Sequence, residues 1–176
     1  MGRRARNILM GLYIGCLYLL QVFFLIGFYC YLHAFFYVSL AFGLLSFPLF
    51  AANIVIACLK IGLPDMDAPK FSLVAKLILI PFFAANLFVC LCALSGFLNP
   101  WLFWAAPAII LLEVGLTYVV LLASSANLIA YLLRKTLQGE IPLKWGVIHI
   151  ILQFCFVLDV VDAIAFYFSH KKKPLV

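Results

Sequence analysis

Three carboxylic acids lie deep inside apolar segments of this sequence. Glu113 is embedded in "AIILLEVGL", and Asp159 and Asp162 lie in "VLDVVDAIA". A charged side chain at the centre of a bilayer costs about 3 kcal/mol even on a lenient insertion scale, so such residues mark functional or tightly paired sites. Asp159 and Asp162 are three residues apart and share one face of a helix. Two carboxylates this close in a low dielectric are not both ionised unless a cation or donor lies between them.

The same kind of segment also contains partners for these acids. Lys76 lies inside an apolar tract, and His149 and Gln153 are four residues apart on one helical face. These side chains fit either a structural ion pair with hydrogen bonds that lock a bundle, or a binding site or pathway for a small solute or ion. The candidates are Glu113, Asp159, Asp162, His149, Gln153 and Lys76.

Helical phase limits how these residues can gather. In one continuous helix Asp162 would lie about 140° around the axis from His149, so a narrow stripe cannot hold all of them. We therefore expect Asp159 to be the centre of a polar cluster that faces the bundle interior. Glu113, His149, Gln153 or Lys76 would supply at least one of its partners.

Catalytic signatures of membrane-embedded enzymes are missing from the sequence. "VLDVVDA" lacks the partner elements of presenilin-like aspartyl proteases, and there is no HExxH motif and no prenyl-diphosphate motif. In "LPDMDAPK", Asp67 stands two residues before Pro69, as a helix N-cap does. The six cysteines fall inside apolar segments and predict neither a disulfide scaffold nor a zinc site. No catalytic residue, metal or cofactor is predicted.

The composition requires a bilayer around these residues. The chain is 68% hydrophobic and 10% charged, with 18 Phe among 176 residues, far from the composition of a soluble domain. We predict a single all-α membrane domain, a polytopic bundle over residues 1–176. Five spans are expected, because each tract exceeds the roughly 20 residues that a crossing helix needs. The predicted spans are residues 8–31, 34–60, 71–97, 101–134 and 145–169. An even number stays open if the fourth tract breaks at Pro107 or Gly115.

Basic residues indicate the orientation of the chain. The net charge is +6, but almost all Lys and Arg lie at the ends of apolar tracts, so nucleic acid is not predicted as a partner. With the N-terminus cytoplasmic, eight of the eleven Lys and Arg outside the spans are cytoplasmic and three, residues 171–173, are external. We expect this orientation in the cell membrane. The basic external tail is its weak point, because positive residues favour the cytoplasmic side.

Three buried asparagines recur in similar settings. Asn53, Asn86 and Asn127 follow small residues, and we interpret them as polar contacts in helix packing. Asn53 and Asn127 are 74 residues apart, as are Lys60 and Arg134. This constant offset predicts that the second and third spans are a parallel repeat of the fourth and fifth, related by an axis along the membrane normal.

The segments "HIILQFCFVLDVVDAIAFYF", "FLNPWLFWAAP" and "LAFGLLSFPLF" resemble a family of small, uncharacterised bacterial membrane proteins. The resemblance extends over most of the chain and implies the bacterial cytoplasmic membrane, with no activity or site residue attached. From the residues we predict a small integral membrane protein in contact with lipid. It would be a membrane-complex subunit or homo-oligomer, or bind or transport a small solute or ion through its buried carboxylates. The alternative is an intramembrane enzyme acting on a lipid.

Overall fold

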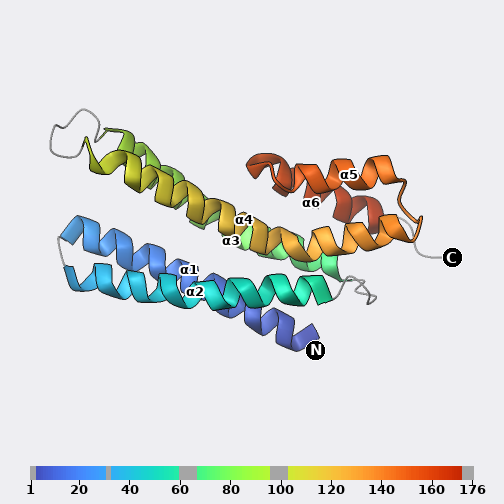
Figure 1. Ribbon diagram of the computed structural model, residues 1–176, viewed down its shortest axis with the longest axis horizontal. Coiled ribbons are helices and arrows are strands. Elements are labelled where there is room, and N and C mark those ends of the chain that lie inside the picture. Colours follow the sequence, from blue (N-terminus) through green and yellow to red (C-terminus); the bar gives the residue numbers. More distant parts are fainter. Residues whose placement is uncertain (1–2, 31–32, 60–66, 96–102, 172–176) are drawn as a thin grey trace. The chain divides into compact units, whose positions relative to one another are not determined.

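The computed structural model is helical throughout the part of the chain that it describes, residues 3–30, 33–59, 67–95 and 103–171 (Figure 1). This agrees with the predicted all-α class. Six helices follow one another in this part. They are α1 (Arg3–Cys30), α2 (His33–Leu59), α3 (Ala68–Ser95), α4 (Ala105–Leu137), α5 (Leu143–Leu152) and α6 (Phe156–Lys171).

Four of the described helices, α1 to α4, are long and apolar enough to cross a membrane. The long first tract divides between Cys30 and His33, where two spans were expected to meet. The expected alternative of a break in the fourth tract is wrong, because α4 continues through Gly115 for 33 residues. Pro107 does not interrupt it, since it is the third residue of the helix, where the backbone N–H has no partner inside the helix.

The expectation of one helix over residues 145–169 needs correction. The helical hydrogen bonds tighten at the end of α5, where the amides of Gln153, Phe154 and Cys155 each bond the carbonyl three residues earlier, at 3.0 to 3.2 Å. The chain then reverses direction. His149 Nδ1 lies 2.5 Å from Asp162 Oδ1, whereas a straight helix would separate residues 13 apart by about 20 Å.

Residues 143–171 are therefore a helical hairpin, which we call the C-terminal hairpin. Its two helices have 10 and 16 residues and are about 15 and 24 Å long. Each is shorter than the roughly 30 Å hydrocarbon core, so neither crosses it alone. Figure 1 shows α5 and α6 folded back against each other. The described part of the chain thus has four helices long enough to cross a membrane, an even number, because the last tract forms a hairpin instead of a fifth span.

The predicted repeat gains no support from this arrangement. α3 is one helix of 28 residues, but the residues 74 positions later form the two helices of the C-terminal hairpin. The expected superposition of residues 34–97 on residues 101–169 therefore fails at the second helix of each pair. The shared spacing of Asn53 and Asn127 remains a sequence pattern only.

The chain divides into two compact units that cut across the helices. The first unit contains Met1–Phe50 and Leu79–Val120, and the second contains Ala51–Ile78 and Leu121–Val176. In the first unit, aromatic side chains join α1 to α2: the Phe23 ring stacks on Phe35 and Phe42, with centroids 5.8 and 5.7 Å away. Tyr18 meets Phe82 of α3 edge to face, with centroids 6.4 Å apart.

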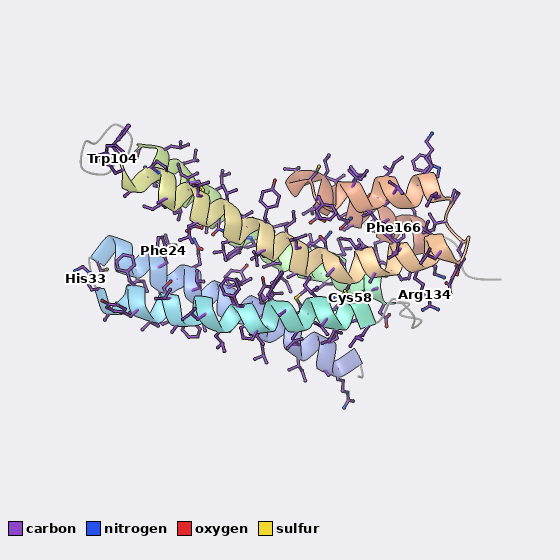
Figure 2. The ribbon with its side chains drawn as sticks, viewed as in Figure 1. Phe24, His33, Cys58, Trp104, Arg134 and Phe166 are labelled. Atoms are coloured by element: carbon purple, nitrogen blue, oxygen red, sulfur yellow. The ribbon has the colours of Figure 1, made fainter. Side chains whose placement is uncertain are left out.

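The core of the second unit seats the C-terminal hairpin on α3 and α4. Its buried members are Leu73, Leu128, Leu132, Ala163 and Phe166. Figure 2 labels Phe166 on the hairpin, and its ring lies 5.3 Å from that of His149. At the start of α5 the approach to α4 is so close that a Cβ on Gly146 would collide with the hydroxyl of Thr136. This packing fixes the hairpin over the polar residues of α3 and α4.

Candidate functional site

Lys76 is the anchor of a polar cluster in the second unit. Its side chain is completely buried, on the α3 face that meets α4 and the hairpin. The ammonium donates to the side-chain oxygens of Gln153 and Asp159, and it lies 3.4 Å from the backbone carbonyl oxygen of Asp159. A buried ammonium is tolerated only when an opposite charge and hydrogen bonds replace its hydration. Lys76 thus ties α3 to the turn and to the second helix of the hairpin.

Asp159 stands between three elements. Its side chain is 1% exposed, and Oδ1 accepts hydrogen bonds from Lys76 and from the Ser125 hydroxyl of α4, the latter at 3.0 Å. It lies in the first turn of α6, where the helix dipole favours a negative charge. Asp159 thus bonds residues of α3 and α4 from the first turn of α6.

Asp162 forms the second half of the cluster, within the hairpin. Gln153 Nε2 donates to Asp162 Oδ2 at 2.5 Å, and His149 Nδ1 lies 2.5 Å from Asp162 Oδ1. The limit set by helical phase does not apply, because His149 and Asp162 belong to different helices that face each other. The amide of Gln153 accepts from Lys76 and donates to Asp162, so it bridges the two carboxylate pairs.

The charges of this cluster do not balance while His149 is neutral. Lys76 supplies one positive charge and Asp159 and Asp162 supply two negative charges. A protonated His149 would balance them. The His149 side chain is also 24% exposed, whereas Asp162 is 3% exposed. His149 is therefore the more exposed member of this pair.

Two serines complete the site, and sequence reasoning missed both. Ser125 bonds Asp159, and Ser72 of α3 donates to the Ser124 carbonyl oxygen of α4 at 3.1 Å. Ser124 and Ser125 have no exposed surface. Small residues let membrane helices approach closely, and their hydroxyls bond across the interface. The available signal was the run "ASSAN" in the middle of a long apolar tract.

The three asparagines are buried as helix-packing residues would be. Asn53, Asn86 and Asn127 are between 1% and 4% exposed. Asn86 Nδ2 on α3 donates to the Thr117 hydroxyl on α4 at 3.1 Å, inside the first unit. This bond is an interhelical contact of the expected kind.

Glu113 does not belong to the cluster on the C-terminal hairpin. It lies in the first unit, whereas Lys76, His149, Gln153, Asp159 and Asp162 lie in the second. Its side chain is 4% exposed, and its buried Oε2 has no hydrogen-bond partner. Across the described residues, no three His, Cys, Asp or Glu side chains are grouped to hold a metal ion. Of the expected candidates, five are joined by hydrogen bonds within the second unit, and Glu113 belongs to the first unit.

Comparison with known proteins places the chain in a family. Residues 3–173 match a family of unknown function, DUF6652, and the chain belongs to that family. No curated protein and no solved structure matches it. The description of the family gives no function, so any function has to be argued from the cluster itself.

Proposed function

We propose that this member of the family is a small integral protein of the cell membrane that binds a proton at Asp162 and His149 and couples it to the passage of a proton or small solute. The observation that carries the proposal is the pairing of the two acids. Asp159 is matched by a lysine, Lys76, and Asp162 by a histidine, His149. The second pair can change its charge without breaking the first.

Gln153 supports a mechanical connection between the two pairs. A primary amide does not relay a proton, but its carbonyl and amino groups orient together. When the charge at Asp162 changes, the strength of its bond from Gln153 Nε2 changes too, because hydrogen bonds to charged groups are stronger. The hydrogen bond from Lys76 to Gln153 Oε1 would then change in geometry, because both bonds are made by the same amide group. Proton binding would thereby act on the attachment of the hairpin to α3.

The hairpin also supports a revised orientation. With four crossing helices and a re-entrant hairpin, a cytoplasmic N-terminus puts the C-terminus on the cytoplasmic side as well. All eleven Lys and Arg other than Lys76 then lie on that side, including Lys171 to Lys173. The external connections, residues 31–32 and 96–104, contain no Lys or Arg. This distribution agrees fully with the positive-inside rule, whereas the five-span topology places Lys171 to Lys173 outside. Trp104, 83% exposed at the start of α4 (Figure 2), fits the external aromatic belt.

Cysteine labelling tests the orientation. Single cysteines at positions 3 and 174 of an otherwise Cys-free protein are expected to be protected from a membrane-impermeant maleimide in intact cells. Both should react once the cells are made permeable, because both ends lie inside. A cysteine at position 98, between α3 and α4, is the matched control and should react in intact cells. Labelling of positions 3 and 174 from opposite sides would restore an odd number of crossings and remove the re-entrant hairpin.

Proton movement tests the function. Purified protein in liposomes that enclose a pH-sensitive dye should let protons enter when a potassium diffusion potential makes the lumen negative. Asp162→Asn is expected to reduce the rate at least about tenfold, because the amide keeps the hydrogen bonds of Asp162 but cannot hold the proton. Lys135→Met is the matched control: it removes the exposed ion pair of Lys135 with Glu140 and should leave the rate unchanged. A rate equal to that of empty liposomes, or one that Asp162→Asn does not alter, would refute the proposal.

A further inference from the structure

The first unit contains a buried acid that has no ion pair among the described residues. Glu113 lies on α4, two turns from its start, and its side chain is 4% exposed. The basic side chains described in this unit are Arg4 and Arg6, at the beginning of α1, and the exposed His33, at the beginning of α2. Arg6 is 12 residues, about 18 Å along the helix, from the Tyr18 contact with α3. A carboxylate in this setting needs a positive charge from another source.

Polar groups of α3 and α4 meet around Glu113. Asn86 donates to Thr117, which lies one turn beyond Glu113 on α4. Cys90 lies one turn beyond Asn86 on α3, and Glu113 lies one turn before Thr117 on α4. Residues 86 and 117, and residues 90 and 113, therefore face each other across an antiparallel helix pair. Asn86 and Glu113 share this interface and lie within about one helical turn of each other.

The interface has acceptors that lack a donor. Glu113 Oε2 and Asn86 Oδ1 are both buried, and neither has a hydrogen-bond partner. In the orientation that the structure has, Asn86 Nδ2 donates to the Thr117 hydroxyl and Asn86 Oδ1 is left without a donor. A buried acceptor oxygen without a donor loses its hydration and gains nothing in return, which destabilises the folded state. One positive charge between the two oxygens would satisfy both.

A neighbouring amide on α1 lies at the same level. Gln21 is one turn beyond Tyr18, and Asn86 is one turn beyond Phe82, the ring that Tyr18 touches. α1 and α3 run in the same direction in Figure 1. Gln21 is 3% exposed, and both its side-chain oxygen and nitrogen are buried without a hydrogen bond. The unit thus gathers unmatched polar groups from three helices.

We infer that Glu113 and Asn86 form a second binding site, independent of the C-terminal hairpin, for a single monovalent cation. Glu113 supplies the negative charge, and the Asn86 carbonyl oxygen and Thr117 hydroxyl supply neutral oxygen ligands. The cation is either a proton on Glu113 that is donated to Asn86 or an alkali ion bound by the same oxygens. Either cation neutralises the charge of Glu113. Either also gives the Asn86 oxygen a positively charged atom to bond.

Few other groups can titrate near this site. On α3 the neighbour is the Cys90 thiol, and on α1 the titratable groups of the packed region are the Cys16 thiol and the phenols of Tyr13 and Tyr18. α2 contributes no acidic or basic side chain between Tyr37 and Phe50. All of these remain uncharged at neutral pH in their ordinary state. A dependence of stability on cations that is lost with Glu113 can therefore be assigned to Glu113.

Thermal unfolding of the purified protein in detergent tests the inference. Sodium chloride is exchanged for choline chloride at constant ionic strength, and each mixture is measured between pH 5 and 9. Glu113→Gln is the matched variant, because its amide supplies the missing donor to Asn86 without a charge. The wild type should gain about 3 to 6 °C in Tm at a cation concentration ten times the dissociation constant. Glu113→Gln should show no such response and should be as stable as the cation-loaded wild type.

The two sources of the cation give different patterns. A rise of the wild-type Tm with sodium at fixed pH, absent in Glu113→Gln, identifies an alkali ion. A wild-type Tm that falls as pH rises, relative to Glu113→Gln and regardless of sodium, identifies a proton, because the folded state then loses its bound proton. Asn86→Leu should weaken either response. Equal responses of wild type and Glu113→Gln, no response in either, or failure of Glu113→Gln to fold would each overturn the site.

Discussion

Lys76→Met is expected to lower the free energy of unfolding by about 3 to 5 kcal/mol, the range found when one member of a buried ion pair is removed. Methionine fills a similar volume, so the loss comes from charge and hydrogen bonds. Asp159 would keep one donor, Ser125, but no opposite charge, and Gln153 Oε1 would lose the donor on α3. The measurement is reversible unfolding in mixed detergent micelles, followed by circular dichroism.

Lys135→Met is the control for this substitution. Lys135 and Glu140 form an ion pair of 2.5 Å whose side chains are 16% and 46% exposed. Exposed pairs of this kind contribute less than about 1 kcal/mol. The same chemical change should therefore have a small effect at position 135 and a large one at position 76. A loss below about 1 kcal/mol for Lys76→Met would show that Lys76 does not hold the hairpin.

Adding Asp159→Leu to Lys76→Met is expected to recover most of the lost stability. Asp159→Leu alone should cost about 3 to 5 kcal/mol, because it leaves the Lys76 ammonium buried without a counter-charge. With both changes no charge is left unpaired at this point, and apolar packing replaces the ion pair. Exchange of a buried ion pair for apolar residues is often neutral or stabilising. The double variant should thus lie within about 2 kcal/mol of the wild type.

The coupling between the two positions is the quantity to measure. A double-substitution cycle gives the interaction free energy from the four proteins, and the losses expected here put it at about 4 kcal/mol or more, because the two single losses together far exceed that of the double variant. Asp159→Asn is a useful third substitution, because its carbonyl oxygen can still accept from Lys76 and Ser125 and its loss should be smaller than that of Asp159→Leu. Additive losses in the double variant would mean that Lys76 and Asp159 do not stabilise the fold as a pair.

The sequence by itself determined the class of fold and the identity of most polar residues that matter. Runs of more than 20 apolar residues leave little choice but membrane helices, because backbone groups in lipid have to be bonded within the segment. The cost of a charge in such a run singled out Glu113, Asp159 and Asp162, and the partner Lys76 was visible for the same reason. These conclusions depend only on local composition, which the sequence contains completely.

Only the tertiary structure decided how the last tract folds and which acids meet. Hydropathy shows that residues 143–171 form an apolar tract. It cannot distinguish a single spanning helix from a helical hairpin, because both remove the same apolar side chains from water. The turn at Gln153 lies where its side chain bonds Lys76, 77 residues earlier, and no local pattern encodes a contact that distant. The same turn brings His149 opposite Asp162, although a single helix would hold them about 20 Å apart. Glu113 remained outside the cluster because the packing of α4 places it with Asn86 and Cys90 of the first unit, which is a property of helix contacts and not of spacing along the chain.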